Sequence, residues 1–507
     1  MSLLLLSPGI ISGQICSQVD TNVLVLGGGI AGVAAARTLH NEGITDFMII
    51  EAQPQLGGRL RTIELRPGSG ITLNAGANWI HGYDPAQPGL HPLIQIVNTS
   101  RCGGIQGTLS DYDSLVVRNS RGMDISDSPN LRYDDYDAAL AVVKTLSEMR
   151  QRDGLPDITV REALTQSGWT PTTAEDEWVD WFSYDSCFAK PPDNSSLFAT
   201  IPLPTYSDFG DPNNTGNFFI TDSEGILKVI RCLADEFLIH NDPRVHLNAT
   251  VKRIEWNDEC VCVMADENGL TRRFCGQHGI LTFSIGVLQE LEKAGIAFEP
   301  PLPQDKVDAI NQFRMTHYLN VIIEFENRFW ESVDFIGYVN ETNGRYFPFF
   351  QHLTHIRDAN VVYSTLTDTV ADRVIRQDRE QTKQEIVDVF NNAYNLTLQP
   401  SDIRTLIIPD WDTNPLFLGS YSNIPIGVTD ETYVTIRKPL GNRLFISGEV
   451  TSKDYSGFVH GGFFSGVDSA EDVISEIRRS SGKGLLMMPI NLCLLTAIAS
   501  IGIFISF

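Results

Sequence analysis

Three glycines near the start of the chain have the spacing of a phosphate-binding loop. Gly27 permits a tight turn, Gly29 lets the backbone approach a pyrophosphate, and Gly32 lets the following helix pack close to a strand. The first residues of that helix, Ile30 and Ala31, bring backbone N–H groups whose partial positive charge attracts phosphates. This spacing predicts a dinucleotide site.

A carboxylate and a second glycine loop follow the first loop. Glu51 lies about 20 residues after the glycines, where an acid accepts hydrogen bonds from a ribose. Gly57 and Gly58 then lead to Arg59, whose guanidinium group suits a phosphate contact. Nicotinamide enzymes have no common need for this second loop, so it favours a different dinucleotide.

The surrounding sequence predicts the elements that must hold these residues. Residues 21–26 form a short aliphatic run ending in glycines, which is typical of a parallel strand buried on both faces. Residues 31–39 are mostly strong helix formers, and residues 47–50 form a second strand. Such a strand–helix–strand unit has a right-handed crossover. Residues 279–283 and 443–448 predict further buried strands.

Longer motifs resemble those of a known superfamily. The run from Asn74 to Gly82 and a later run from Ser447 to Gly466 resemble FAD-binding motifs of the flavin amine oxidase superfamily. Residues 200–211, 312–330 and 419–423 resemble its polyamine oxidase branch. The glycine loops and these two runs are three motifs that occur in the same order as in the superfamily, so chance does not explain the likeness.

This resemblance covers roughly residues 21–478 and implies FAD as the cofactor of an amine oxidase. By the likeness, Glu449 holds the ribityl chain or a ribose, and Val459 lines the flavin. The implied reaction removes a hydride equivalent from the carbon next to an amine nitrogen, and dioxygen then reoxidises the flavin with release of peroxide. The implied cofactor-binding residues are Gly27, Gly29, Ile30, Ala31, Gly32, Glu51, Arg59, Ala77, Asn78, Val251, Trp411, Glu449 and Val459.

The implied catalytic residues are Trp79, His81, Asn320 and Phe458. Aromatic side chains such as Trp79, Phe417 and Phe458 could clasp an amine and its methylene chain, partly by cation–π contact, or could simply pack in the core. The predicted substrates are a polyamine-like or secondary amine and O2.

The sequence departs from the polyamine oxidase pattern at three positions. Where the family has a lysine that holds a water near flavin N5, this sequence has Asn320, which brings no positive charge. Where close polyamine oxidases carry glutamates, it has His81 and Cys187. Asp185 or Asp208 could supply the missing negative charge, or either could be structural.

The predicted fold combines the α/β and α+β classes in two domains. Residues 21–90, 222–290 and 432–480 are expected to form an FAD-binding, Rossmann-like domain with a doubly wound, parallel sheet. Residues 91–221 and 291–431 are expected to form a substrate-binding domain with a mixed sheet and helices. The active site then lies between the domains, as ligand pockets often do.

Composition limits the partners that the protein can bind. The formal net charge of −25 opposes binding to nucleic acid phosphates, whereas it could attract a cationic small molecule or only aid solubility. The eight cysteines include no CxxC pair and no histidine at metal-ligand spacing, so no structural metal is expected. Cys260 and Cys262 alternate in a strand-like run and are predicted to be small buried thiols.

Both ends of the sequence carry apolar runs. Residues 481–507 are predicted to be a hydrophobic tail that attaches the protein to a membrane, either as a tail anchor or as a lipid-anchor signal. Residues 1–20 are a candidate signal segment, although no Lys or Arg precedes their apolar part. Six Asn-x-Ser/Thr sequons favour the secretory route and a glycoprotein: Asn98, Asn194, Asn213, Asn248, Asn340 and Asn395.

Two other functions stay open on the sequence. The protein could oxidise a different amine or an amino acid in specialised metabolism, and an amino acid would need an arginine facing the flavin. It could also bind FAD without turnover, because Asn320 replaces the family lysine.

Overall fold

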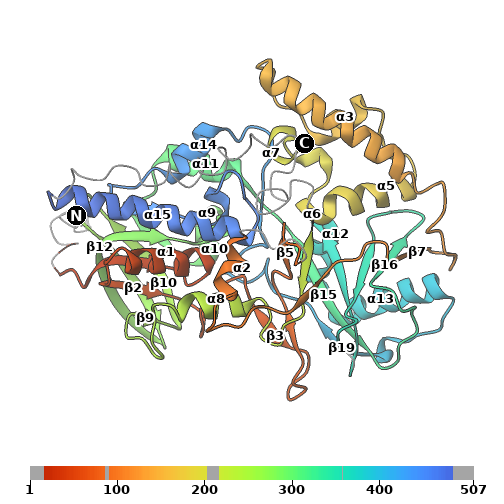
Figure 1. Ribbon diagram of the computed structural model, residues 1–507, viewed down its shortest axis with the longest axis horizontal. Coiled ribbons are helices and arrows are strands. Elements are labelled where there is room, and N and C mark those ends of the chain that lie inside the picture. Colours follow the sequence, from red (N-terminus) through yellow and green to blue (C-terminus); the bar gives the residue numbers. More distant parts are fainter. Residues whose placement is uncertain (1–15, 17, 86–90, 202–215, 357, 483–507) are drawn as a thin grey trace, which may run out of the picture.

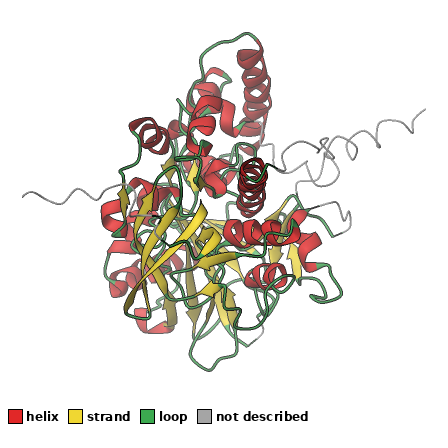
Figure 2. Ribbon diagram, turned by 90° about the vertical axis from the view of Figure 1, so that its left-hand side faces the viewer, coloured by secondary structure: helices red, strands yellow, loops and turns green. Residues whose placement is uncertain are grey.

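The computed structural model contains two large β-sheets, one in the left half and one in the right half of Figure 1, and helices pack around them (Figure 1; Figure 2). The structure describes residue 16 and residues 18–482, except residues 86–90, 202–215 and 357. The predicted tail from residue 483 onward and residues 1–15 therefore lie outside the described residues, as does Asp208.

The first sheet joins strands from distant parts of the chain. Among the described residues its order is β13–β10–β11–β12–β1–β2–β9, and β21 also pairs with β12. The centre is parallel, while β10, β11 and β12 form an antiparallel meander because short turns join them. Its strands are β1 (Thr21–Leu26), β2 (Phe47–Ile50), β9 (Val245–His246), β10 (Ala249–Trp256), β11 (Val261–Glu267), β12 (Leu270–Leu281), β13 (Ala297–Glu299) and β21 (Leu444–Ile446).

Strand β1 is buried on both faces, as its aliphatic run predicts. Val23 and Val25 belong to the core beneath the helices α1 (Ile30–Asn41) and α15 (Val459–Ser480), which lie alongside each other (Figure 1). Leu24 and Leu26 belong to the core on the opposite face. The strand–helix–strand prediction is therefore confirmed.

The second sheet has the order β19–β15–β18–β17–β16–β7 within the described residues. All of its pairs are antiparallel except β16 with β7. The helix α13 (Arg379–Tyr394) packs beside this sheet through Phe390, which contacts Phe325 and Phe350 (Figure 1). The strands are β7 (Leu115–Asn119), β15 (Tyr318–Phe325), β16 (Phe335–Val339), β17 (Phe349–His352), β18 (Asn360–Thr367) and β19 (Ile403–Ile407).

Smaller elements complete the described structure. The remaining strands pair as β3 (Thr62–Glu64) with β4 (Thr72–Asn74), β14 (Arg314–Met315) with β20 (Ser422–Asn423), and β8 (Asn217–Ile220) with both β5 (Trp79–His81) and β6 (Gly107–Leu109). The remaining helices are α2 (Pro92–Val97), α3 (Tyr133–Arg152), α4 (Val160–Gln166), α5 (Ala174–Asp180), η2 (Trp181–Asp185), α6 (Ser186–Phe188), η3 (Pro192–Asn194), α7 (Leu197–Thr200), α8 (Leu227–Ala234), α9 (Ile285–Gln289), α10 (Leu291–Ala294), α11 (Gln304–Gln312), α12 (Asp368–Arg376), η5 (Pro400–Asp402), α14 (Asp430–Arg437) and η6 (Glu449–Thr451).

The two sheets confirm the predicted fold class, a nucleotide-binding part and a part with a mixed sheet and helices. The boundaries between the two predicted domains stay a prediction. One strand of the first sheet, β13, comes from residues 297–299, which the prediction assigned to the other domain.

Disulfides correct the prediction for the cysteines. The described residues form the pairs Cys16–Cys260, Cys102–Cys232 and Cys262–Cys275. The prediction that Cys260 and Cys262 are thiols is therefore wrong. Cys262 lies directly opposite Cys275 in the register of β11 and β12, and Cys16 is 244 residues from its partner. Such pairings depend on strand register and tertiary contact, which spacing along the chain does not reveal.

No described helix combines the length and the apolar composition that crossing a membrane requires. Membrane attachment thus stays a prediction, because the predicted tail lies almost wholly outside the described residues.

Candidate active site

A continuous cavity of about 550 Å³ is lined by residues of both sheets. We call the part lined by the loops of the first sheet the glycine-loop end; it includes Gly29, Glu51 and Glu449. We call the part lined by rings from the second sheet and its neighbours the aromatic end. Its rings are Trp79, Tyr112, Trp181, Phe182, Tyr318, Phe335, Phe349 and Phe458.

The first glycine loop owes its shape to backbone geometry. Gly27 has a φ of +110°, a conformation that favours glycine. A Cβ at Gly32 would lie 1.9 Å from the carbonyl oxygen of Gly27, so only glycine allows this approach. By contrast, a Cβ at Gly29 would meet no described protein atom closer than 3.9 Å. Gly29 therefore presents bare backbone to the cavity, whereas Gly32 serves the turn.

Glu51 is a buried carboxylate at the end of β2. It accepts hydrogen bonds from the backbone N–H of Gly28 at 2.5 Å and of Gln53 at 2.8 Å. Burial raises the pKa of Glu51, although these two N–H groups oppose the rise. The carboxylate is thus fixed at the cavity wall, beside the start of α1.

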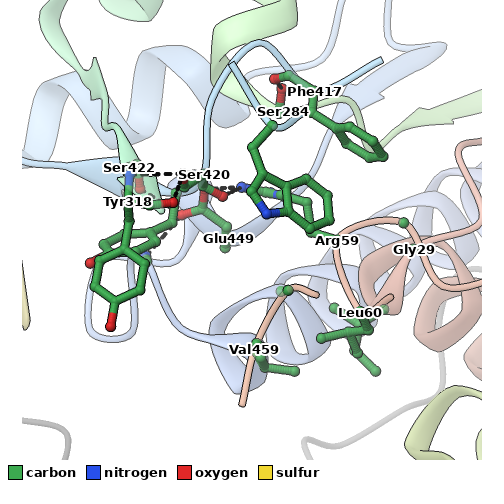
Figure 3. Close-up of a pocket in the computed structure, with 18 of the residues that line it drawn as sticks. Gly29, Arg59, Leu60, Ser284, Tyr318, Phe417, Ser420, Ser422, Glu449 and Val459 are labelled. Carbon is green, nitrogen blue, oxygen red and sulfur yellow. Dashed lines mark hydrogen bonds and ion pairs between the residues drawn. The ribbon is translucent and has the colours of Figure 1, made fainter. Parts of the chain in front are cut away.

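An ion pair joins the two later motifs on the same wall. The Nη1 atom of Arg59 donates to the carbonyl oxygen of Ser420 at 2.8 Å and lies 3.2 Å from Oε1 of Glu449 (Figure 3). The other carboxylate oxygen, Oε2, accepts from Ser422 Oγ and from the N–H of Gly457. Both charged side chains line the cavity, so this ion pair fixes the wall of a ligand site.

Asn78 supplies a further buried polar group to the cavity wall. Its side chain is 1% exposed and lines the cavity, and neither its amide nitrogen nor its amide oxygen has a hydrogen-bond partner among the described residues. A buried amide without partners is rare in proteins unless a ligand or water satisfies it. The polar edge of a bound ring system would do so.

A π-helical turn carries part of the aromatic end. The helix α5 continues directly into η2, which places Trp181 and Phe182 in the cavity wall. Trp181 donates from Nε1 to Thr367 Oγ1 at 2.8 Å, which ties the turn to β18. Single π-helical turns occur often at functional sites, because the extra residue shifts the direction of side chains.

Buried charges flank the rings of this turn, because Asp180 directly precedes it and Asp185 is its last residue. Arg345 binds Asp185 at 2.7 Å and Asp180 at 3.1 Å, and both carboxylates are almost completely buried. Burial raises the pKa of Asp185 to about 6, although the charge of Arg345 opposes the rise. Asp185, proposed from the sequence as a source of negative charge for a substrate, is therefore engaged with Arg345.

Neutral polar groups lie on β15 and β18. Asn320 is buried, and its Oδ1 accepts from Thr365 Oγ1 at 3.0 Å, which leaves its amide nitrogen for the cavity. Tyr318 lies two residues earlier, on the same face of the strand. Burial raises the pKa of Tyr318 above its usual range, so its phenol stays protonated.

The predicted residues of β5 also reach the cavity. Trp79 donates from Nε1 to Ser110 Oγ at 3.0 Å. His81 Nδ1 lies 2.7 Å from the amide oxygen of Asn217, and its ring packs edge-to-face with Phe458 at 5.3 Å. Burial lowers the pKa of His81, so the imidazole is neutral at physiological pH.

The structure brings nearly all of the predicted site residues together. Of the predicted cofactor-binding residues, Gly32 is the one that does not line the cavity in the described structure. The residues that do are Gly27, Gly29, Ile30, Ala31, Glu51, Arg59, Ala77, Asn78, Val251, Trp411, Glu449 and Val459, together with the candidate catalytic residues Trp79, His81, Asn320 and Phe458.

Sequence reasoning did not select most of the aromatic end. Tyr112, Trp181, Phe182 and Phe335 line the cavity but come from three separate parts of the chain, because Trp181 and Phe182 are neighbours in η2. Their positions share no spacing that would mark them, and aromatic residues of this kind are also common in cores.

The chain is similar to known proteins over most of its length. The family model described as flavin containing amine oxidoreductase matches residues 30–474. The chain belongs to this family. Among its amine oxidoreductase relatives, polyamine oxidase 1 of Zea mays is 32% identical over 479 residues, which cover 91% of this chain and 92% of the relative. Polyamine oxidase 7 of Oryza sativa is 31% identical and covers 92% and 98%.

Solved structures show the same fold. A putrescine oxidase variant superposes with a TM-score of 0.70 at 18% identity, covering 90% of this chain and 99% of that chain. Cyclohexylamine oxidase from Brevibacterium oxydans gives 0.68 at 19% identity, covering 91% and 100%.

This flavin-containing amine oxidoreductase is thus an FAD-dependent amine oxidase, and the glycine-loop end fits its cofactor. Gly29 offers bare backbone for a pyrophosphate, Glu51 offers a fixed carboxylate for a ribose, and Asn78 offers an amide without partners for a ring edge. Val459, at the start of α15, lines the same cavity.

Proposed function

We propose that the protein oxidises the carbon–nitrogen bond of a polyamine-like or secondary amine. The observation that carries this proposal is the single cavity that connects the glycine-loop end to the aromatic end. Bound FAD would supply two-electron redox chemistry: the amine would lose two electrons and two protons to become an imine that water hydrolyses, and dioxygen would gain two of each to become hydrogen peroxide.

The residues of the chain act by binding and orienting the amine. Rings such as Trp79 and Phe458 offer their faces to the carbon next to the amine nitrogen. The same faces can stabilise the protonated form of the amine by cation–π contact. Asn320 offers an amide N–H to a water or to the amine, because Thr365 already binds its oxygen. His81 offers a neutral imidazole, held in one orientation by Asn217.

Oxidation of an amino acid has less support. Its carboxylate would need an arginine near the reacting carbon. Arg59, the arginine among the described residues that line the cavity, is engaged with Glu449 and Ser420 at the glycine-loop end.

The test uses purified protein with bound flavin. Under anaerobic conditions a substrate amine should bleach the flavin absorbance near 450 nm, on the order of one equivalent per site. In air the same amine should yield peroxide. A broad panel of primary, secondary and polyamines that neither bleaches the flavin nor yields peroxide would contradict the proposed function.

We further propose that the protein follows the secretory route, carries glycans and attaches to a membrane through its C-terminal tail. The three disulfides support the first part, because disulfides persist in oxidising compartments. The sequon residues Asn98, Asn194, Asn248 and Asn395 are exposed, as glycan acceptors must be. Expression in a eukaryotic secretory host, with enzymatic glycan removal and detergent phase partition, tests each part separately.

A further inference from the structure

The rings of the aromatic end form a connected group. Tyr112 stacks on Phe335 with centroids 5.0 Å apart, and Phe335 stacks on Phe349 at 5.2 Å. Phe349 also contacts Trp181 at 5.9 Å and Phe182 at 5.8 Å. All five side chains line the cavity, so this group is one apolar surface built from four separate parts of the chain.

The negative charges of the cavity lie elsewhere. The carboxylates among its described lining residues are Glu51 and Glu449, which belong to the glycine-loop end and already accept hydrogen bonds there. Asp180 and Asp185, on α5 and η2, bind Arg345 and do not line the cavity in the described structure. The acids that adjoin Tyr112 and Phe335 in sequence, which are Asp111, Asp113 and Asp334, are also not among its described lining residues. Side chains between the rings are neutral, such as Asn320 and Thr365.

The apolar rings and the absence of a carboxylate among their described neighbours in the cavity wall favour some amines over others. Aromatic faces stabilise a single ammonium group, or accept the neutral amine, at little cost. A linear polyamine brings further ammonium groups along its chain, and each pays a desolvation cost in an apolar surrounding unless a carboxylate meets it. An aromatic substituent instead gains about 25 cal/mol for every Å² that it buries against the rings.

We propose that the cavity selects an amine with one basic nitrogen and an aromatic, or similarly bulky and apolar, substituent over a linear polyamine. This inference rests on the proposed amine oxidation and names its substrate class. Phe349 is the specificity-determining residue, because it lines the cavity and contacts three of the other four rings, Phe335, Trp181 and Phe182.

The first test compares two series of amines on the holoenzyme. N-methylbenzylamine and N-methylphenethylamine represent the aryl class, and spermidine and spermine represent the linear class. The expected result is a kcat/KM at least tenfold higher for the aryl class, which is a difference of about 1.4 kcal/mol. A higher value for spermidine or spermine overturns this inference but supports the proposed function. Failure of all amines to bleach the flavin overturns both.

The second test adds the missing charge. Cys187 lines the cavity, is exposed and takes no part in the disulfides, so a longer side chain can be placed there. The ratio of kcat/KM for spermidine to that for N-methylbenzylamine should be about tenfold higher in Cys187→Glu than in Cys187→Gln, the neutral variant of matched size. Equal ratios in the two variants would show that charge does not set the preference.

The third test removes part of the ring group. Phe349→Ala should raise the dissociation constant of N-methylbenzylamine, measured from the dependence of the anaerobic flavin reduction rate on amine concentration, by about tenfold or more. Phe349→Leu keeps apolar volume and should recover most of the affinity. An unchanged dissociation constant in Phe349→Ala would overturn the assignment of the ring group as the substrate wall.

Discussion

The two ends of the cavity differ in the atoms that form them, which are mainly backbone atoms at one end and side-chain atoms at the other. At the glycine-loop end the important atoms belong mainly to the backbone, as at Gly27 and Gly29, and the carboxylate of Glu51 is held by backbone N–H groups. At the aromatic end they belong to side chains such as Phe182 and Phe349, brought together by packing. Cofactor binding thus depends on local backbone geometry, whereas substrate choice depends on tertiary arrangement.

The largest expected effect comes from breaking the glycine-loop end alone. In Gly32→Ala the new methyl group would meet the carbonyl oxygen of Gly27 at 1.9 Å, so α1 must move away from β1. We expect flavin content after dialysis to fall by about a hundredfold or more, with a lower melting temperature.

Gly29→Ala is the matched control for that variant. Its methyl group has no protein atom within 3.9 Å but enters the space beside the phosphate-binding backbone. The variant should keep its melting temperature as apoprotein and bind FAD about tenfold more weakly. Equal loss of fold in the two alanine variants would contradict the separate roles of the two glycines.

The aromatic end can be disrupted by removing Arg345, which binds the buried carboxylates next to its rings. Arg345→Met leaves the buried carboxylates of Asp180 and Asp185 without this partner, and removing one member of a buried ion pair costs about 3 to 5 kcal/mol. We expect a lower free energy of unfolding and a higher KM for amines. The affinity for FAD, measured by fluorescence titration, should change less than threefold. A tenfold loss of FAD affinity would show that the two ends are not independent.

The pH dependence of stability sharpens the same comparison. Because the pKa of Asp185 rises from 3.8 to about 6 on folding, the folded protein binds this proton more tightly than the unfolded chain does. Its contribution favours the fold most below pH 3.8 and is lost as the pH rises through 6. Asp185→Asn removes this term, so its destabilisation should be about 2 to 3 kcal/mol larger at pH 4 than at pH 7.5. Urea unfolding at the two pH values provides the measurement.

The smallest expected effect concerns Asn320, which lies on β15 and lines the cavity. Asn320→Lys brings a positive charge into the cavity, where negative charge develops as dioxygen is reduced. We expect reoxidation of the chemically reduced flavin to be about tenfold faster by stopped flow, and Asn320→Met to show no such gain. The same rate in all three proteins would show that residue 320 does not take the role of the family lysine.

The sequence predicted the glycine-loop end better than the aromatic end, and the reason is physical. The strands at residues 21–26 and 47–50 and the helix between them follow from local pattern, and the spacing of Gly27, Gly29 and Glu51 follows from the loop that they form. The antiparallel meander of β10 to β12 and the pairing of Cys262 with Cys275 depend on register, which no local pattern contains.

The aromatic end could not be predicted from the sequence for a related reason. Trp181 and Phe182 point into the cavity because α5 ends in a π-helical turn, and Phe335 and Phe349 do so because β16 and β17 pair beside that turn. An aromatic residue in a core and one in a substrate wall have the same local sequence signature. Only the assembled packing separates them.

The order of strands in the first sheet also determines when the FAD site can fold during translation. β1 and β21 both pair with β12, yet Leu444 to Ile446 leave the ribosome long after Thr21 to Leu26. Glu449 and the start of α15 follow β21 directly. A nascent chain therefore cannot complete the FAD site until almost its whole length has emerged, so flavin uptake marks the end of folding and not an early step.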